Sequence, residues 1–186
     1  MKNQEDEKSL REEFLNSQKV YDGKMISVKY DTVLLPNGKV AFREVVEHPG
    51  AVAVVPVTKS GKIVLVRQYR YPVGQVLWEI PAGKLSPKED PDDCALRELA
   101  EETGFTAKTL KKLGSIFTGP GFTNEIIHLY LADKIAEGTQ NLDEDEFLHV
   151  AMYTQKQVKK MVKTGEICDA KTIAGLTLAG MDNWEQ

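Results

Sequence analysis

The 186-residue sequence is poor in cysteine and in histidine. Its two cysteines, Cys94 and Cys168, have the spacing of neither a disulfide framework nor a metal-ligand pair, which excludes a disulfide-stapled secreted protein. The three histidines, His48, His128 and His149, also lack ligand spacing. A protein of the reducing cytoplasm is therefore expected, without a metal site built from cysteine or histidine.

Long apolar runs and clusters of basic residues are also missing. No apolar run is long enough to span a bilayer, and the acidic first fifteen residues lack the apolar core of a signal peptide. The 24 basic and 28 acidic residues give a formal net charge of −4, so no positive field is available to hold nucleic acid by its phosphates. We expect neither a membrane nor nucleic acid as a partner.

Turn dipeptides divide the chain into two parts. Asp22-Gly23 and Asn37-Gly38 are typical of tight hairpin turns, and Pro49-Gly50 ends the segment that contains them. The strands beside these turns are expected at residues 19–21, 25–35 and 39–47. The sequence therefore predicts an N-terminal antiparallel β-meander over residues 1–47 and a second domain over residues 48–186.

The second domain mixes strands with one early and two late helices. Its strands are expected at residues 51–57, 63–69, 114–117, 126–131 and 147–153. The early helix is expected at residues 91–103, with Asp90 as its N-cap and Gly104 as its stop. Thr154 and Gln157 form a capping box for the next helix, and the last helix follows Asp169. This order predicts an α+β fold in which a mixed β-sheet is sandwiched between α-helices.

The helix expected at residues 91–103 has a crowded acidic face. At about 100° per residue, Glu98, Glu101 and Glu102 lie within an arc of about 100°. Repulsion at these spacings costs about 0.2–0.5 kcal/mol per pair, and the helix C-terminus adds about 0.3–1 kcal/mol for each anion. A bound magnesium ion would turn this repulsion into net stabilisation, because magnesium prefers carboxylate oxygens and is commonly shared with substrate phosphates. The alternative, an ordinary solvated helix, predicts interspersed basic residues instead.

The segment from residue 83 to residue 105 resembles the Nudix box. Its matching positions are Gly83, Glu89, Arg97, Glu98, Leu99, Glu101, Glu102, Gly104 and Phe105. The segments REVVEHPGAVAVVPV, VRQYRYPVGQVLWEIPAGKL and PGFTNEIIHLYLA extend the likeness to the ADP-ribose pyrophosphatase branch. The resemblance implies the Nudix fold and hydrolysis of ADP-ribose to AMP and ribose 5-phosphate. The alternatives are another nucleoside diphosphate sugar, such as GDP-mannose, and a non-catalytic ADP-ribose sensor.

The resemblance also implies a metal site. Its ligands would be Glu98, Glu101, Glu102 and the backbone carbonyl of Ala82. Glu101 would serve either as a ligand or as an outer carboxylate, and the ion would be Mg²⁺, with Mn²⁺ as the alternative. Arg97 would pair with carboxylates of the helix. Glu89 would be either an outer carboxylate or a structural part of its loop.

In the branch that this sequence resembles, the catalytic base is a glutamate on a loop after the box. In this sequence the loop contains Asp143, Glu144, Asp145 and Glu146. Glu146 is the first candidate and Glu144 the second. The competing interpretation is an acidic, solvated hairpin loop without a catalytic role.

Five residues are implied as substrate contacts: Arg43, Glu44, Arg67, Arg70 and Pro120. Arg67 and Arg70 are candidates for the diphosphate, since a guanidinium fork suits phosphate oxygens, although a solvated strand end explains them too. Arg43 and Glu44 resemble nucleoside-contacting positions, with Phe42 or Tyr21 as stacking surfaces. Pro120 stands where a proline marks ADP-ribose hydrolases, in a Gly-Pro-Gly segment that turn chemistry alone also explains.

The resemblance further implies a homodimer in which the N-terminal strands are exchanged and complete the partner's substrate site. The meander over residues 1–47 suits this role, because a short meander by itself buries too little surface to be stable.

Overall fold

The computed structural model describes residues 9–181 of the chain. The chain divides into an N-terminal unit, Met1–Pro49 with Gly119–Glu125, and a core unit, Gly50–Thr118 with Ile126–Gln186. The sequence placed the division after residue 47 and did not separate Gly119–Glu125 from the second domain. That segment joins the N-terminal unit because Val46 donates its N–H to the carbonyl of Phe122 at 2.7 Å and accepts a bond from the N–H of Asn124 at 3.3 Å.

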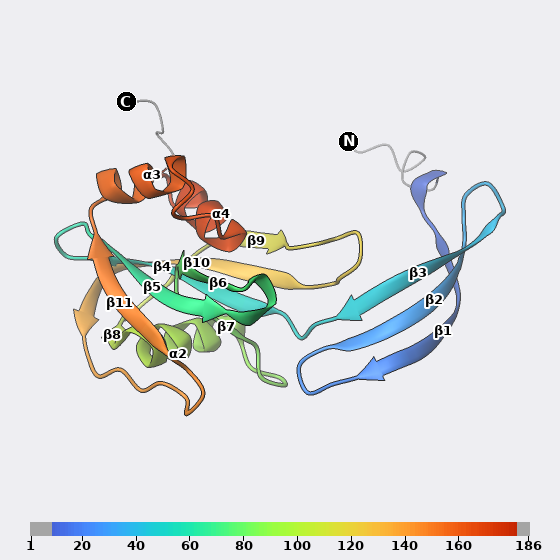
Figure 1. The fold of residues 1–186 in the computed structure, drawn as a ribbon, viewed down its shortest axis with the longest axis horizontal. Coiled ribbons are helices and arrows are strands. Elements are labelled where there is room, and N and C mark those ends of the chain that lie inside the picture. The colour runs from blue at the N-terminus through green and yellow to red at the C-terminus, as the bar shows by residue number, and fades with distance from the viewer. Residues whose placement is uncertain (1–8, 182–186) are drawn as a thin grey trace. The chain divides into compact units, whose positions relative to one another are not determined.

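The N-terminal unit contains a three-stranded antiparallel sheet (Figure 1). Its strands are β1 (Glu13–Asp22), β2 (Ser27–Leu34) and β3 (Val40–Glu47), in that order across the sheet. Strand β1 is longer than the predicted 19–21, because its polar first half pairs with β2 from Glu13, opposite Leu34, onward. Pairing across the sheet outweighs the weak strand propensity of that half.

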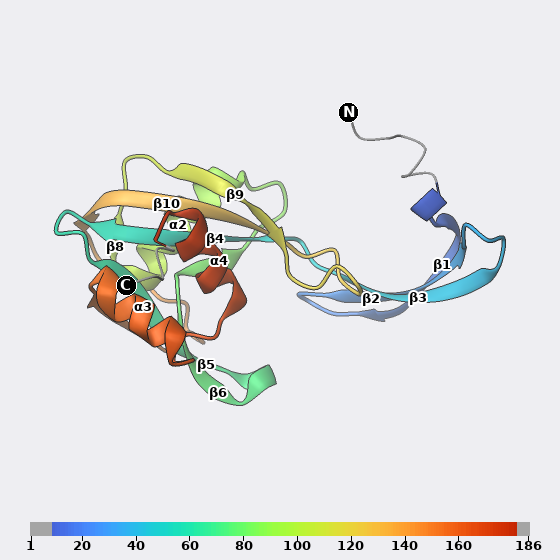
Figure 2. The same cartoon turned by 90° about the horizontal axis from the view of Figure 1, so that it is seen from above.

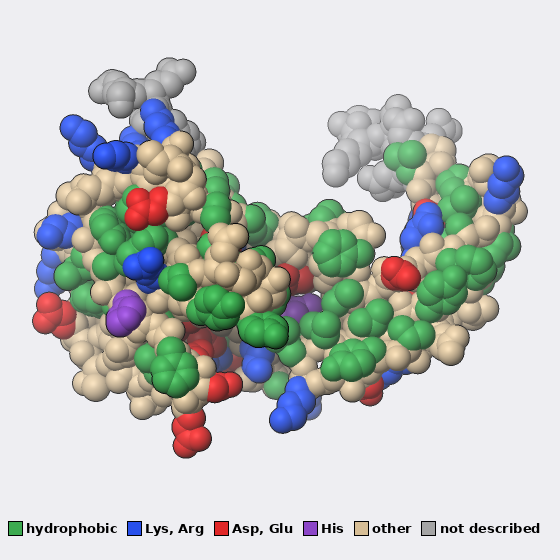
Figure 3. All heavy atoms as spheres, in the orientation of Figure 1, with side chains coloured by type: hydrophobic (Ala, Val, Ile, Leu, Met, Phe, Trp, Pro, Cys, Tyr) green, Lys and Arg blue, Asp and Glu red, His purple; other side chains and the backbone are tan. Residues whose placement is uncertain are grey.

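Much of this sheet is exposed in the described part of its unit. Every residue of β1 is exposed, and Phe42 on β3 remains 55% exposed although its ring stacks on Tyr30 with centroids 5.1 Å apart. Hydrophobic side chains gather over the N-terminal sheet in Figure 3. In the described residues of this unit, only Val33 is a buried hydrophobic residue.

The core unit is built on a mixed sheet. Its strands are β4 (Ala51–Thr58), β5 (Ile63–Arg70), β6 (Gln75–Glu79), β7 (Ala82–Lys84), β8 (Phe105–Thr106), β9 (Lys111–Phe117), β10 (Ile126–Glu137) and β11 (Leu148–Tyr153). The order is β11-β5-β4-β10-β8, with β6 beside β5, β7 beside β4 and β9 beside β10. Strands β4 and β10 are parallel, and the other pairs are antiparallel. The sequence did not predict β6, β7 or β8, which are short.

Helices cover both faces of this sheet, as Figures 1 and 2 show. Helix α2 (Pro91–Thr103) packs on the face that carries Val52, Val54 and Val64. Helices α3 (Gln155–Lys163) and α4 (Ala170–Leu178) pack on the face that carries Ala53, Val55 and Leu65. The predicted α+β fold, with its mixed sheet between helices, is confirmed. Among residues 9–181, no helix has the length and apolarity needed to cross a membrane.

Candidate active site

Helix α2 has the bounds that its sequence predicts. The Asp90 side chain accepts a hydrogen bond from the N–H of Asp92 at 2.8 Å, and Gly104 ends the helix with a φ of 71°. That positive φ favours glycine. The helix is anchored by its buried residues Cys94, Ala95 and Leu99. Capping and burial together fix the direction in which the acidic face points.

Two glutamates of α2 lie against the backbone of β7. A Cβ atom added at Gly83 would lie 1.9 Å from the carboxyl carbon of Glu98, so only glycine permits this approach. The N–H of Ala82 donates to Oε2 of Glu102 at 3.1 Å. Strand β7 is held in place by pairing with β4, where Ala82 lies opposite Ala53. The segment Ala82–Gly83 and the carboxylates of α2 therefore form one fixed assembly.

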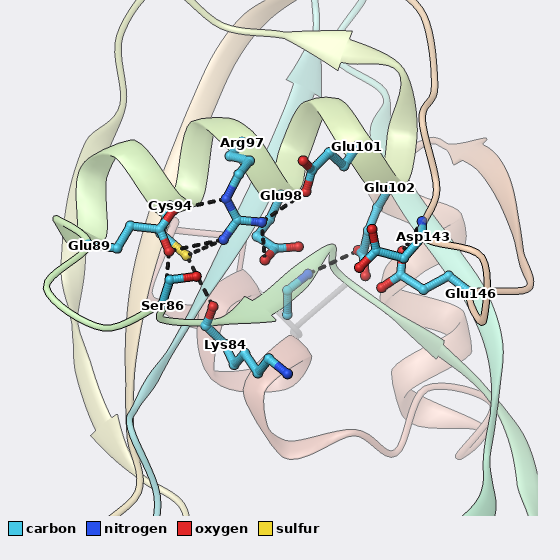
Figure 4. A network of polar contacts seen from close by, with 11 residues as sticks. Lys84, Ser86, Glu89, Cys94, Arg97, Glu98, Glu101, Glu102, Asp143 and Glu146 are labelled. Carbon is cyan, nitrogen blue, oxygen red and sulfur yellow. Dashed lines mark hydrogen bonds and ion pairs between the residues drawn. The ribbon is translucent and has the colours of Figure 1, made fainter. Parts of the chain in front are cut away.

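Arg97 connects the carboxylates of this assembly (Figure 4). Its Nη1 donates to Glu98 at 2.7 Å and to Glu101 at 2.8 Å, which confirms the predicted pairing with helix carboxylates. Its Nε and Nη2 donate to both oxygens of Glu89 at 2.8 and 3.0 Å. The Arg97 hydrogen bonds, together with that from the N–H of Ser86, lower the pKa of Glu89 to about 2. Glu89 thus anchors both Arg97 and its own loop.

Glu98 and Glu102 are buried carboxylates with raised pKa values. Burial is the main cause for Glu98, and Glu101 and Glu146 add to it, while Arg97 opposes it. Burial also raises the pKa of Glu102 to about 8, and the charges of Glu98 and Glu146 raise it further. The Ala82 N–H and Arg70 oppose the rise without cancelling it. Both groups would be stabilised as carboxylates by a cation.

These donors fit a hard divalent cation. Glu98 and Glu102 supply carboxylate oxygens, and the carbonyl of Ala82 belongs to the residue whose N–H already binds Glu102. In the described part of the chain, no three acidic, cysteine or histidine side chains converge closely enough to enclose an ion by themselves. Arg97 draws Glu98 and Glu101 toward itself, and repulsion between like charges keeps the other acidic side chains apart. Oxygen donors of this kind suit Mg²⁺ that keeps waters or substrate oxygens among its ligands.

The loop of residues 141–146, the acidic loop, lies beside this assembly. The N–H of Asn141 donates to the carbonyl of Glu101 at 3.1 Å, which ties the start of the loop to α2. Glu146 is half-buried, and its charge acts on both Glu98 and Glu102 (Figure 4). Glu144 is exposed in the same loop. The structure thus places Glu146 within electrostatic reach of the α2 carboxylates.

Arg67 and Arg70 lie on opposite faces of β5. A separation of three residues reverses the side of a strand, so the two side chains do not converge. Arg67 shares the face of Leu65, where its guanidinium lies 5.5 Å from the ring centroid of Trp78. Arg70 binds Glu79 through Nε at 2.8 Å and Nη2 at 2.7 Å. Its charge also acts on Glu102, so of the two arginines it is the one near the acidic assembly.

Sequence reasoning missed an ion cluster around Glu79. This carboxylate is 1% exposed and accepts hydrogen bonds from Arg70 and from Lys171, at the start of α4. Burial alone would raise the pKa of Glu79, but the two cations outweigh it and leave the pKa below its usual value. The sequence does contain a signal for this cluster, namely a single acidic residue inside the apolar segment Trp78–Pro81. A charge buried in such a segment requires partners of opposite charge.

The remaining predicted substrate residues belong to the N-terminal unit. Arg43 pairs with Glu12, to which its Nε donates at 3.0 Å, and it also binds the carbonyl of Phe42 at 2.8 Å. Glu44 is exposed and lies opposite Tyr30 in the sheet. Pro120 is exposed in a turn closed by bonds from the N–H groups of Phe122 and Thr123 to the carbonyl of Gly119.

Comparisons with known proteins agree with this geometry. A model of the NUDIX domain matches residues 47–176. The chain is 48% identical to an ADP-ribose pyrophosphatase of Bacillus subtilis, with 89% of this chain and 90% of the relative covered. It is 44% identical to a methanol dehydrogenase activator of Bacillus methanolicus, with 89% and 91% covered. A crystal structure of an ADP compounds hydrolase shares the fold, with a TM-score of 0.81 at 22% identity and coverage of 92% of this chain and 94% of that one.

Proposed function

The chain belongs to the Nudix family, and we propose that it is an enzyme that hydrolyses the diphosphate of ADP-ribose to AMP and ribose 5-phosphate. The observation that carries this proposal is the pair of buried carboxylates, Glu98 and Glu102, fixed against the Gly83 and Ala82 backbone. The 48% identity to an ADP-ribose pyrophosphatase supports the choice of substrate.

We assign metal binding to the acidic face of α2. Glu98, Glu102 and the carbonyl of Ala82 would hold Mg²⁺, with Glu101 as a further or outer carboxylate and Mn²⁺ as a substitute. When bound, such an ion would neutralise charge on the diphosphate and activate water. Arg97 does not face the substrate in this scheme, because its guanidinium is committed to Glu89, Glu98 and Glu101. Its role is to orient the carboxylates.

We assign Glu146 as the general base that accepts the proton of the attacking water. Its carboxylate lies within electrostatic reach of Glu98 and Glu102, and an acceptor near an attacked phosphorus can orient and deprotonate water. Attack at phosphorus breaks one bond of the P–O–P bridge, and the two products leave as phosphomonoesters. Glu144, in the same loop, is the second candidate for this base.

Substrate contacts are assigned in order of their support. Arg70 is the first candidate for a diphosphate oxygen, because it is 39% exposed and near Glu102. Arg67 is second, since it stacks over Trp78 on the other face of β5. Arg43, Glu44 and Pro120 would contact the nucleoside part in the assembled protein.

The assembly we propose is a cytoplasmic homodimer that exchanges its N-terminal strands. The support is the uncovered sheet of the N-terminal unit, with β1 exposed along its whole length and the Tyr30–Phe42 stack open to solvent. Edge strands and apolar faces of this kind are normally covered by a partner. A second copy of the chain would bury them.

A substrate panel tests the function. The purified protein is incubated with ADP-ribose, ADP-glucose or GDP-mannose, with Mg²⁺, with Mn²⁺ or with chelator, and nucleoside monophosphate release is measured. We expect the highest kcat/KM for ADP-ribose with metal, and no release by Glu102→Gln. A preference for GDP-mannose would overturn the substrate, and tight binding of ADP-ribose without turnover would indicate a sensor. The relative named for dehydrogenase activation makes this assay necessary, since family membership alone does not fix the activity.

A further inference from the structure

The ion cluster around Glu79 brings two cations to one buried carboxylate, with Asp169 as a second carboxylate beside Lys171. Glu79 is 1% exposed, and both Arg70 and Lys171 bind it. One cation is enough to balance a buried carboxylate, whereas none leaves a costly unpaired charge. The second cation is therefore available for another task.

The two cations differ in how firmly they are held. The side chain of Lys171 is 12% exposed, and its Nζ also lies 3.1 Å from Oδ2 of Asp169. The side chain of Arg70 is 39% exposed, and among residues 9–181 its carboxylate partner is Glu79. Of the pair, Arg70 is the more exposed to solvent.

The first turn of α4 fixes the position of Lys171. The hydroxyl of Thr172 accepts the N–H of Ile80 at 2.9 Å and donates to Asp169 at 2.6 Å. The N–H of Thr172 also donates to Asp169, at 3.0 Å. Because this turn binds the backbone directly after Glu79, Lys171 stays beside Glu79 whatever Arg70 does.

Arg70 has a second anionic neighbourhood to turn to. Arg70 shares the face of β5 with Val64, which packs against residues of α2, so its guanidinium lies on the side of the sheet that α2 covers. A diphosphate bound at that face would bring phosphate oxygens, which a guanidinium binds through paired hydrogen bonds.

We propose that Lys171 is a positioning residue, the permanent counter-ion of Glu79, which allows Arg70 to pass from Glu79 to an oxygen of the substrate diphosphate. This inference rests on the proposed function. Without Lys171, Arg70 would be the only cation on a buried carboxylate and would remain there. Lys171 acts on the substrate through Arg70 and does not touch it.

The test is a double-variant cycle on ADP-ribose. Lys171→Met keeps the length of the side chain and removes its charge, and we expect it to raise KM about tenfold with a smaller change in kcat. Lys171→Arg should restore KM. In an Arg70→Met background, Lys171→Met should add less than about a twofold change, because its effect passes through Arg70. Lys160→Met, on α3, is the matched control and should behave as the unaltered chain.

A second readout is independent of turnover. Calorimetry of ADP-ribose binding in chelator should show the same pattern of affinities, and Glu79→Gln combined with Lys171→Met should recover affinity, since a neutral amide needs no counter-ion. An equal loss from Lys171→Met in both Arg70 backgrounds would overturn the proposal, as would failure of Lys171→Arg to rescue. If the unaltered protein hydrolyses a different nucleoside diphosphate sugar, the proposed substrate is wrong, and the same non-additivity is expected with that compound.

Discussion

The core unit and the N-terminal unit both contain antiparallel strand pairs, yet they differ in how their apolar surface is covered. In the core unit, Val52 to Val55 of β4 are 0% exposed, because helices pack on both faces of the sheet. In the N-terminal unit, every residue of β1 is exposed. A sheet is stable in water when its apolar face is covered. The core unit supplies that cover from its own chain, whereas the described part of the N-terminal unit leaves β1 exposed.

The charged pairs of the two units differ in the same way. Glu79 and Glu102 are buried in the core unit, where each lost partner or added cation has a large effect. The pairs Lys19–Asp22 and Arg43–Glu12 of the N-terminal unit are well exposed. Exposed pairs contribute about 0–1 kcal/mol. The comparison predicts that substitutions in the core unit lower catalytic activity, whereas changes in the N-terminal unit weaken dimer formation.

The largest effect is expected from the buried carboxylates. Glu98→Gln and Glu102→Gln should each lower kcat by about 10³-fold or more, since each removes a ligand of the cation that would offset the diphosphate charge in the transition state. Steady-state assays over a magnesium titration measure this loss. Glu137→Gln, at an exposed end of β10, is the control. Near-normal turnover in either variant would refute the metal assignment.

The next effect concerns the acidic loop. Glu146→Gln should lower kcat by about 10²-fold or more with little change in KM or in metal affinity, because a general base acts chiefly in the transition state. Glu144→Gln should lose less, and Asp143→Asn should lose least. The three variants are compared at saturating magnesium. Small, equal losses would show that the loop is only a solvated cover.

A third change separates the two units. Removal of residues 1–47 should give a monomer or an aggregate with little ADP-ribose hydrolysis, as light scattering and activity would show. Phe42→Ser is a milder change and should shift the dimer toward monomer, because it removes an exposed ring that stacks on Tyr30. Tyr71→Ser, at an 86% exposed position of the core unit, is the matched control. A fully active monomer lacking residues 1–47 would contradict the proposed exchange.

The smallest effect is on stability without metal. The pKa of Glu102 is about 8 in the fold against an ordinary 4.5, so its stabilising contribution is complete below that ordinary value and is lost as the pH rises through about 8. In chelator, the thermal midpoint should therefore fall between pH 5 and pH 8, and Glu102→Gln should be more stable at pH 8 by about 1–2 kcal/mol. Magnesium should reverse this order. Identical midpoints for both proteins at pH 8 in chelator would exclude the burial penalty.

Much of the core unit could be predicted because its signals are local. The bounds of α2 follow from Asp90, Pro91 and Gly104, and the helical period alone places Glu98 and Glu102 on one face. The capping box of Thr154 and Gln157 is also present. The strands β6 and β7 were missed because short strands have too few residues to show a period. The length of strand β1 was underestimated because its polar residues become part of the strand only through pairing with β2.

The sequence by itself determined the helix, its caps, its acidic face and the family, since these depend on residues within one or two turns of each other or on motif spacing. Tertiary structure alone decided that Lys171 meets Glu79 across 92 residues, that Gly83 admits Glu98, and that Arg70 rather than Arg67 lies near Glu102. The physical reason is that these contacts depend on strand register and on which sheet face each helix covers. No local pattern specifies such contacts, because they exist only once the whole core has packed.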